Sequence, residues 1–360
     1  MSRLNDREAM ALCLRLARRG AGKASPNPMV GAVVADDRGT AGTGWYRGPG
    51  TPHAETIALD EAGERARGAT LYVSLEPCAH HGKTPPCVDA VISSGVGRVV
   101  VAMADPDSRV SGRGSDALRR AGIEVEEGLM EDRARLLNEA YVTHRTENRP
   151  FVTYKAALSL DGRTAASDGS SKWITSEPAR RDVQRLRARS DAVAVGIGTV
   201  LADDPLLTVR GRRTRPPLRV VLDSHARTPL LARVLTSEAP ALVITGVRAP
   251  RERVLGLQGA GAEVVTVPEE EGRVSLKHAL EALAGRRITS LLLEGGRTLA
   301  GAFASAGFID RYVLYLAPKL VGGPAGLVEW AAGSLGLAKA LEITSVRRIG
   351  PDLRVTAREI

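Results

Sequence analysis

The chain has 360 residues, of which 43% are hydrophobic and only 3% aromatic, and its formal net charge is +9. This length fits two domains or one large one, with a core built mainly from aliphatic side chains. So few aromatic residues argue against a surface that stacks single-stranded bases. The positive charge is spread along the chain without a polybasic tail, which is more typical of a solvated surface than of a nucleic-acid interface. We therefore expect small phosphorylated ligands, served by a few local arginines, and no nucleic acid.

The first ten residues, MSRLNDREAM, contain no apolar stretch behind their positive charge, so they do not resemble a secretory signal. No apolar run approaches the roughly 20 residues that a membrane-spanning helix needs. The sequence therefore predicts a cytoplasmic protein without a membrane partner, in which thiols stay reduced and a disulfide is disfavoured. The oligomeric state is left open, with a homodimer or a homotetramer as the alternatives to a monomer.

The first part of the chain alternates helix and strand patterns. A helix is predicted over 5–20, where Met10 and Cys13 lie on an apolar stripe and Gly20 suits the end. Cys13 is therefore expected in the core. Short Val-rich runs predict buried strands of a helix-covered sheet at 29–36, 69–76 and 98–105. Further helices are expected near 53–63, 86–95, 113–122 and 131–145.

The polar segment HRTENRP, at 144–150, is the best candidate for a domain boundary. It ends in proline directly before a new apolar strand, FVTYKAAL, after which the alternation restarts. The strands predicted after this point lie near 151–157, 191–197, 218–223, 240–245, 263–267, 288–294 and 311–317. The clearest helical patterns between them are at 176–189 and 275–285. Two α/β domains, at 1–147 and 150–360, fit the usual domain sizes.

The stretch PCAHHGKTPPC, at 77–87, holds two of the three cysteines of the chain. Upstream, PHAE places His53 and Glu55 at the expected start of a helix. One imidazole and two thiolates, from His53, Cys78 and Cys87, match the three protein ligands of a catalytic zinc, which leaves the fourth position to water. Glu55 is not needed as a ligand and can transfer the protons of that water. This order of residues is the signature of zinc nucleobase deaminases; the alternative is an ordinary helix start and two packed cysteines.

Four motifs, SPNPMVGAVV, PHAE, LEPCAHHGKTPPCVDAVI and DPDSRVSGRG, resemble the deaminase half of the bifunctional riboflavin-biosynthesis deaminase–reductases. Eight residues separate the two cysteines, whereas cytidine and transfer-RNA adenosine deaminases have two, and this insert indicates the riboflavin branch. The resemblance implies a cytidine-deaminase-like three-layer α/β/α domain, with zinc on His53, Cys78 and Cys87 and with Glu55 as the catalytic proton donor. It also implies that Asn27 holds the pyrimidine. The pocket residues that it implies next to the cysteines are His80, His81 and Lys83, for which an exposed loop is the alternative.

The second part carries YKAALSLDGRTA, SSKWITSEPAR, VGIGTVLADDPLLTVR, VLDSHAR, LLLEGGRTLAGAF and LYLAPKLVGG. LLLEGG predicts a strand that ends in two glycines before a helix at Arg297, a turn whose backbone N–H groups can approach a phosphate. Taken alone, this pattern is more typical of a tight turn in any α/β protein, and the G-x-G-x-x-G fingerprint is absent there. Together, the motifs resemble the reductase half of the same family, whose α/β fold is like that of dihydrofolate reductase.

This resemblance implies an NADPH site and a substrate site in the second domain. The implied NADPH contacts are Ala157, Trp173, Thr199, Asp203, Ser224, Gly296, Arg297, Thr298, Leu299, Ala300, Gly301 and Ala302. The implied substrate contacts are Ser171, Arg187, Leu207, Arg210 and Glu294.

Two of these arginines make physical sense as a clamp for a ribose phosphate, because a guanidinium fork matches phosphate oxygens. A surface ion pair is the alternative for Arg187 and Arg210, and a core anchor is the alternative for Trp173. Lys155 and Asp161 flank the expected pocket, but the sequence assigns neither a role in proton transfer.

By resemblance, then, the first domain is expected to deaminate 2,5-diamino-6-(5-phosphoribosylamino)pyrimidin-4(3H)-one with zinc. The second is expected to reduce the ribosyl group of the product to ribityl with NADPH. One alternative is a nucleotide or transfer-RNA deaminase with a degenerate second domain. Another is a nucleic-acid-binding protein with a structural zinc, which would need a fourth protein ligand and a concentrated basic stripe.

Overall fold

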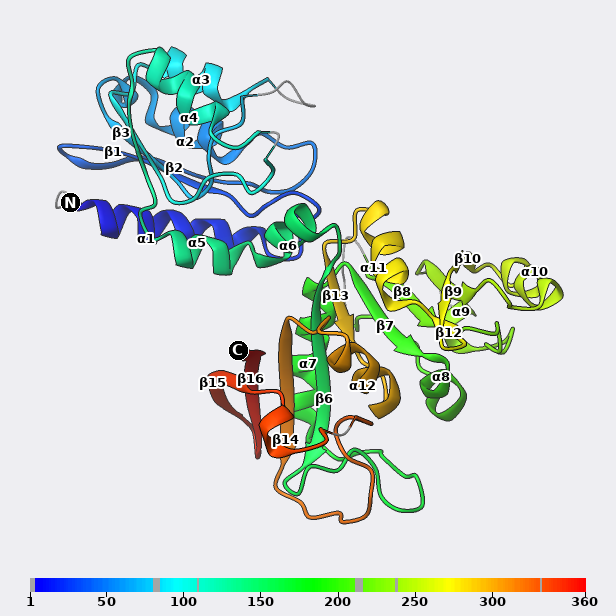
Figure 1. Cartoon of the computed structure of the whole chain (residues 1–360). Helices are drawn as coiled ribbons and strands as arrows, with labels where there is room; N and C mark the ends of the chain where they lie inside the picture. Colours follow the sequence, from blue (N-terminus) through cyan, green and yellow to red (C-terminus); the bar gives the residue numbers. More distant parts are fainter. Residues whose placement is uncertain (1–3, 80–84, 109, 211–215, 237–238, 331) are drawn as a thin grey trace. The chain divides into compact units, whose positions relative to one another are not determined.

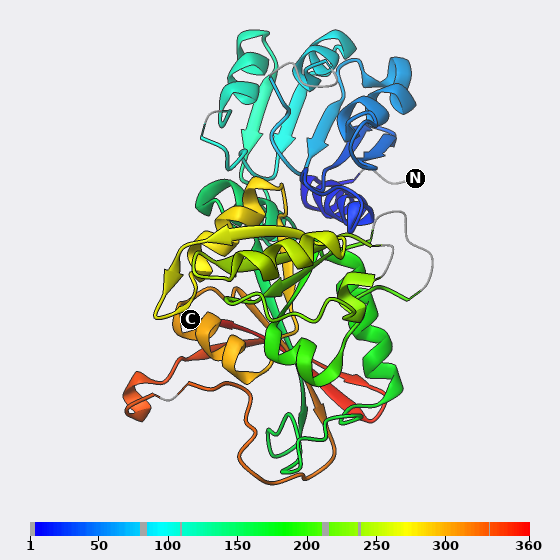
Figure 2. The ribbon, with the colours of Figure 1, turned by 90° about the vertical axis from the view of Figure 1, so that its right-hand side faces the viewer.

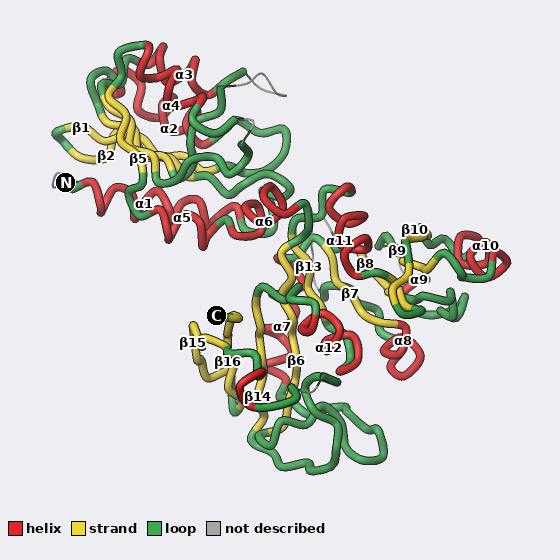
Figure 3. Tube along the Cα trace, viewed as in Figure 1, coloured by secondary structure: helices red, strands yellow, loops and turns green. Residues whose placement is uncertain are grey.

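The computed structural model describes residues 4–79, 85–108, 110–210, 216–236, 239–330 and 332–360. It divides the chain into two compact units, Met1–Asn148 and Arg149–Ile360. Figure 1 colours both units along the chain, and Figure 3 shows the helices and strands of each. No helix in these ranges is long and apolar enough to cross a bilayer.

The first unit is a three-layer α/β/α structure around a five-stranded sheet. The strand order is β2–β1–β3–β4–β5; β1 is antiparallel to β2 and β3, whereas β3, β4 and β5 are parallel. The helices α2, α3 and α4 cover one face of this sheet, and α1, α5 and α6 lie on the other (Figure 1). The strands are β1 (Gly31–Asp36), β2 (Gly39–Trp45), β3 (Thr70–Val73), β4 (Arg98–Val101) and β5 (Glu124–Glu127). The helices are α1 (Asp6–Ala17), α2 (Ala54–Ala62), α3 (Cys87–Ser94), α4 (Arg113–Arg120), α5 (Glu131–Leu137) and α6 (Glu139–Glu147).

Strand β1 builds both cores of this unit because its side chains alternate between the two faces. Ala32 and Val34 pack in the core beneath α2 and α3, whereas Val33 packs with Met10 and Cys13 of α1. Helices cover both faces, so this strand is an uninterrupted apolar run rather than an alternating one. The predicted core position of Cys13 is confirmed.

Two glycines of β2 let α2 lie directly on the sheet. A Cβ atom at Gly42 would lie 2.1 Å from the carbonyl oxygen of Ala58, and one at Gly44 would lie 1.9 Å from that of Ala54. Any side chain at either position would push the helix away. These glycines therefore set the position of the first turn of α2, which follows His53.

The second unit contains a nine-stranded sheet in the order β10–β9–β8–β7–β13–β6–β14–β16–β15. The first seven strands in this order are parallel to one another. The C-terminal hairpin of β15 and β16, red in Figure 2, continues the sheet with antiparallel pairing. The strands are β6 (Phe151–Ser159), β7 (Ala192–Gly196), β8 (Leu218–Leu222), β9 (Ala241–Gly246), β10 (Glu263–Val267), β13 (Ser290–Leu293), β14 (Arg311–Ala317), β15 (Leu341–Ile349) and β16 (Asp352–Glu359). A separate short hairpin pairs β11 (Glu269–Glu270) with β12 (Arg273–Val274).

Helices cover both faces of this second sheet as well. Apolar residues of α11 and α12 pack on one face, and those of α7, α8, α9 and α10 pack on the other. These helices are α7 (Glu177–Arg189), α8 (Ile197–Asp203), α9 (Arg233–Thr236), α10 (Arg251–Gly259), α11 (Leu276–Gly285) and α12 (Arg297–Ser305). The prediction of an α/β fold for both parts of the chain is confirmed.

Most predicted elements are present, and β10 and β14 have the predicted bounds. The helix predicted over 131–145 is wrong in one respect, because Asn138 divides it into α5 and α6. The Asn138 side chain accepts a hydrogen bond from the backbone N–H of Met29 at 2.8 Å and donates one to its carbonyl at 3.0 Å. The sequence patterns missed β2, which is rich in glycine, and β5, which is acidic. They also missed the short hairpin of β11 and β12 and the C-terminal hairpin of β15 and β16.

Candidate functional site

His53, Cys78 and Cys87 come together at the ends of three elements of the first unit. His53 directly precedes α2, Cys87 is the first residue of α3, and Cys78 follows β3. Nδ1 of His53 lies 2.8 Å from Sγ of Cys87 and 3.7 Å from Sγ of Cys78, and the two sulfur atoms are 3.3 Å apart. All three possible ligand atoms lie within 4.8 Å of one another. Every cysteine of the chain is a free thiol, so the disulfide alternative is not present.

The two thiols of this cluster have different acidities because they are hydrogen-bonded to each other. This bond is the main reason that the pKa of Cys78 lies well below its ordinary value, and His53 lowers it further. The same bond, together with burial, raises the pKa of Cys87. The backbone N–H of Cys87, at the start of α3, also donates to Sγ of Cys78 at 3.3 Å. The arrangement therefore stabilises a thiolate, the form of cysteine that binds metals.

Glu55 lies in the first turn of α2, two residues after His53, and only 3% of its surface is exposed. Burial is the main cause that raises the pKa of its carboxyl group, and the negative charge of Cys78 adds to this effect. A carboxyl group whose pKa is raised holds a proton more readily than an exposed one, which suits a group that takes up and releases protons.

A tyrosine that the sequence patterns did not single out connects Asn27 to this cluster. The Asn27 amide donates to the hydroxyl of Tyr46 at 2.6 Å, and the Tyr46 ring meets the His53 ring edge-on, with centroids 5.5 Å apart. Tyr46 is 5% exposed, and its burial raises the pKa of its hydroxyl. The only available signal was its position directly after Trp45 in a chain that is poor in aromatic residues. The predicted pocket residues His80, His81 and Lys83 lie outside the described residues.

The second unit contains a pocket of about 1740 Å³. All five predicted substrate residues line it, and so do most of the predicted NADPH residues. The predicted residues in its wall are Ala157, Ser171, Trp173, Arg187, Thr199, Asp203, Leu207, Arg210, Ser224, Glu294, Gly296, Arg297, Thr298, Leu299 and Ala302. Ala300 instead packs in the core beneath α12, and Gly301 packs against Glu329, whose carbonyl oxygen would lie 2.7 Å from a Cβ atom there.

Arg187 and Glu294 form a buried ion pair in the pocket wall. Nε and Nη2 of Arg187 lie 2.6 and 2.9 Å from the two carboxylate oxygens, and Nη1 donates to the carbonyl of Thr208 at 3.0 Å. Burial by itself raises the pKa of Glu294, but Arg187 and Lys155 bring it below its ordinary value. Burial also lowers the pKa of Lys155. The ion pair that the sequence left as an alternative for Arg187 exists, but it is inside the pocket rather than on the surface.

The turn LLLEGG forms as predicted, since β13 ends at Leu293 and α12 begins at Arg297. Gly296 is the residue that precedes the first turn of α12. Thr199 lies beside this turn, since its Oγ1 would be 3.8 Å from a Cβ atom at Gly296. Gly296 lines the pocket and no side chain caps α12, so the positive end of the helix faces the pocket.

The segment with Ser171 and Trp173 is held over the same pocket by two contacts. Lys172 forms an ion pair with Asp203 at 3.0 Å, and Nζ of Lys319 donates to the carbonyl of Trp173 at 3.0 Å. The Trp173 ring stacks on the guanidinium of Arg180, with a separation of 4.6 Å, and 60% of its surface is exposed. Trp173 is therefore not the core anchor that the sequence left as an alternative.

Both parts of the chain match known families. Residues 150–355 match the RibD C-terminal domain, and residues 3–103 match the zinc-binding region of cytidine and deoxycytidylate deaminases. The riboflavin biosynthesis protein RibD of Aquifex aeolicus is 45% identical over 360 residues, which cover 98% of both chains. The chain belongs to the RibD family. It is thus a bifunctional deaminase and reductase of riboflavin biosynthesis, and the resemblance in its motifs is confirmed.

Solved structures agree with this membership of the RibD family. Acinetobacter baumannii RibD, form 1, is 39% identical, with a TM-score of 0.90 over 99% of both chains. A protein from Thermotoga maritima is 35% identical, with a TM-score of 0.86 over 98% of both chains. Its structure is described as a diaminohydroxyphosphoribosylaminopyrimidine deaminase/5-amino-6-(5-phosphoribosylamino)uracil reductase. The alternative of a deaminase with a degenerate second domain is therefore set aside.

Proposed function

We propose that the first unit deaminates 2,5-diamino-6-(5-phosphoribosylamino)pyrimidin-4(3H)-one and that the second unit reduces 5-amino-6-(5-phosphoribosylamino)uracil with NADPH. These activities correspond to those named for the relative from T. maritima. The observation that carries the first half is the convergence of His53, Cys78 and Cys87 within 4.8 Å, close in sequence to a buried Glu55. Both substrates are small phosphorylated molecules of metabolism, which supports a cytoplasmic location.

The donor atoms of the cluster fit zinc, because one imidazole nitrogen and two sulfurs form a common ligand set of this ion. When bound, zinc acts as a Lewis acid and lowers the pKa of water. Among the residues that the structure describes, the cluster has three members, and three protein ligands are typical of catalytic rather than structural zinc. The alternative of a structural zinc protein is correspondingly disfavoured.

Glu55 moves the protons in the proposed deamination. Water adds to the ring carbon that carries the amino group, ammonia leaves, and a carbonyl group forms. Glu55 takes a proton from the attacking water and passes it to the adjacent ring nitrogen. The proton of the new hydroxyl group then passes through Glu55 to the amino nitrogen, which leaves as ammonia, and the raised pKa of the buried carboxyl group suits both transfers. Asn27 orients the pyrimidine in this proposal, a role supported by its link to His53 through Tyr46.

In the second unit, the pocket has room for a coenzyme and a substrate together. Its volume of about 1740 Å³ exceeds the roughly 300–1,000 Å³ of a typical small-molecule site. The Gly296 turn at the start of α12 suits the coenzyme phosphates, and NADPH would supply the hydride for C1 of the opened ribose. Arg210 is the better candidate for the substrate phosphate, because Glu294 already occupies the fork of Arg187.

The substitution Glu55→Gln tests this assignment, because it keeps the size of the side chain but removes its ability to carry a proton. We expect deamination to slow by about 10²–10⁴-fold, while zinc stays bound and the variant still oxidises NADPH when given the aminouracil substrate. Rates on each substrate separately, together with metal analysis, provide the measurement. Loss of both activities on their own substrates would contradict the assignment of the two reactions to separate sites.

A further inference from the structure

Glu76 precedes Pro77 and Cys78, and its side chain has an unusual set of partners. Only 6% of its surface is exposed. Oε2 accepts hydrogen bonds from the backbone N–H groups of Asp105 and Gly112, at 3.1 and 3.0 Å. Oε1 accepts from those of Gly114 and Ser115, at 2.8 and 3.3 Å. Within the described ranges, no lysine, arginine or histidine forms an ion pair with this carboxylate.

These four bonds close a loop and cap a helix at the same time. Asp105 and Gly112 both lie between β4 and α4, and one carboxylate oxygen accepts from both of them. Gly114 and Ser115 lie in the first turn of α4, which is preceded by Gly112, a residue that has no side chain to cap it. A carboxylate at a helix N-terminus satisfies the unpaired N–H groups there and is favoured by the helix dipole. Glu76 therefore supplies from another element the cap that α4 lacks in its own sequence.

The backbone of Glu76 and Pro77 is also held in place by its neighbours. A Cβ atom at Gly114 would lie 2.0 Å from the carbonyl oxygen of Pro77, so only glycine fits there. The N–H of Glu76 donates to the carbonyl of Met103 at 3.0 Å, which continues the pairing of β3 with β4. The segment that leads to Cys78 is thus held by a side chain, an N–H group and a close backbone contact, and proline further restricts its φ.

We infer that Glu76 is a positioning residue, which fixes the sulfur of Cys78 relative to His53 and Cys87 by joining the 76–78 segment to the backbone of Asp105 and Gly112 and to α4. A carboxylate is required because its two oxygens offer about four acceptor sites for four donors. A glutamine would direct an NH₂ group at two of those donors. This inference rests on the proposed role of Cys78 as a zinc ligand.

The test uses the full-length chain and measures zinc affinity by competition with a chromophoric chelator. Groups that orient metal ligands typically change affinity by about 10–100-fold when they are lost, and we expect this loss for Glu76→Gln. Gly114→Ala should have the same effect through the collision with Pro77. The visible spectrum of the Co²⁺-substituted protein should shift in both variants, because it reports the geometry of the thiolate ligands. Reduction of the aminouracil substrate should stay unchanged, since the second unit does not contain these residues.

Two matched variants separate positioning from a general loss of stability. At Gly97 a new Cβ atom would meet nothing nearer than 3.4 Å, so Gly97→Ala controls for Gly114→Ala. Asp36 accepts from the backbone N–H of Arg38 and pairs with Arg65, so Asp36→Asn controls for the loss of a bonded carboxylate. Neither should change zinc affinity or the Co²⁺ spectrum. If Glu76→Gln does not fold, Glu76→Asp, which keeps the charge but shortens the reach, takes its place.

The outcomes distinguish this inference from the proposed function. If Cys78→Ser keeps zinc, the metal site itself is wrongly assigned. If Cys78→Ser loses zinc while Glu76→Gln retains the wild-type affinity and Co²⁺ spectrum, only the role of Glu76 is overturned. The same conclusion follows if Asp36→Asn weakens zinc binding as much as Glu76→Gln does.

Discussion

The three cysteines of the chain have different surroundings, so the same substitution should have different effects at each. Cys78 and Cys87 face His53, whereas the thiol of Cys13 donates to the carbonyl of Gly31 at 2.8 Å on the other side of the sheet. Burial raises the pKa of Cys13 and keeps it neutral. A neutral buried thiol is a small core group rather than a ligand.

We therefore expect Cys78→Ser and Cys87→Ser each to abolish tight zinc binding, because a serine hydroxyl does not replace a thiolate ligand. Cys13→Ser serves as the control and should retain about one zinc per chain. Metal analysis after exhaustive dialysis provides the measurement. Full zinc occupancy in both of the first two variants would refute the ligand assignment.

Arg187 and Arg210, both in the pocket of the second unit, differ in what their side chains already bind. Arg187 is held by Glu294. Among the residues that the structure describes, Arg210 bonds only through its backbone N–H, to the side chain of Gln184, and its guanidinium pairs with no carboxylate. Arg210→Ala should thus remove a contact to the substrate phosphate without breaking a buried ion pair. Hydrogen bonds to charged groups contribute about 1.5–3 kcal/mol, which corresponds to a KM for the aminouracil substrate raised about 10–100-fold.

Two readouts restrict the interpretation of Arg210→Ala. In this variant the KM for NADPH and the rate of deamination should be unchanged. Arg251→Ala is the control: Arg251 lies on α10 and outside the pocket lining, so this variant should change neither deamination nor reduction. An unaltered KM for the aminouracil substrate in Arg210→Ala would mean that another residue binds the phosphate.

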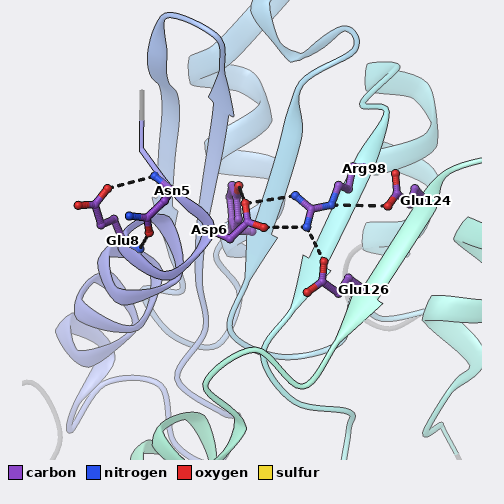
Figure 4. A network of polar contacts seen from close by, with 7 residues as sticks. Asn5, Asp6, Glu8, Arg98, Glu124 and Glu126 are labelled. Atoms are coloured by element: carbon purple, nitrogen blue, oxygen red, sulfur yellow. Dashed lines mark hydrogen bonds and ion pairs between the residues drawn. The ribbon is translucent and has the colours of Figure 1, made fainter. Parts of the chain in front are cut away.

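At the scale of elements, the start of α1 is tied to the sheet by a network of polar contacts (Figure 4). Asn5 and Glu8 form a capping box, in which each side chain accepts from the backbone N–H of the other residue, at 2.9 and 3.0 Å. Asp6 accepts two hydrogen bonds from Arg98 of β4, at 3.2 and 2.8 Å, and one from the hydroxyl of Tyr72 of β3, at 2.6 Å. Burial and the bond to Asp6 raise the pKa of Tyr72 to about 12.

Arg98 is central to this network, because it also bonds Glu126 and lies 3.9 Å from Glu124 of β5 (Figure 4). Its side chain is 24% exposed, so Arg98→Met should leave several carboxylates close together without a cation. We expect a loss of about 1–2 kcal/mol in the free energy of unfolding, measured by urea denaturation. Arg38→Met is the control, since that side chain is 78% exposed and its ion pair with Asp37 is long, at 4.0 Å. Equal stability of the two variants would show that the network contributes nothing.

At the scale of the whole molecule, the division into two units falls between Asn148 and Arg149. Arg149 belongs with the second unit, because its guanidinium forms two hydrogen bonds of 2.7 Å with Asp310. Asp310 also accepts from the N–H of Val152 at the start of β6, at 2.6 Å. A cut before Arg149 should thus preserve contacts that a cut after Pro150 would remove.

We predict that fragments 1–148 and 149–360 each fold when expressed separately, because each has its own sheet and its own buried core. The first fragment should deaminate and the second should oxidise NADPH on the aminouracil substrate. Circular dichroism with thermal melting, followed by both assays, provides the measurement. A fragment 151–360 should melt at a lower temperature than 149–360; equal melting temperatures would show that Arg149 does not stabilise the second unit.

The sequence by itself determined the fold class of both units and the three members of the His53, Cys78 and Cys87 cluster. Val-rich runs bounded by turn residues are sufficient to locate β1, β3, β4 and the parallel strands of the second unit, because burial on both faces requires uninterrupted apolar residues. His53, Cys78 and Cys87 could be grouped because cysteine is scarce in this chain and the order of residues matches a chemistry that needs three ligands. Family resemblance then supplied the pocket residues of the second unit.

Only the tertiary structure decided which partner each polar side chain has. Glu76 lies 36 and 38 positions before the N–H groups of Gly112 and Gly114, and Arg187 meets Glu294 across 107 positions. Asn138 breaks a helix because of Met29, 109 positions earlier. Helical and strand periodicity reports on the burial of nearby residues, whereas a hydrogen bond depends on where distant segments meet. The three residues of the cluster were therefore readable from the sequence, but the groups that hold them in place were not.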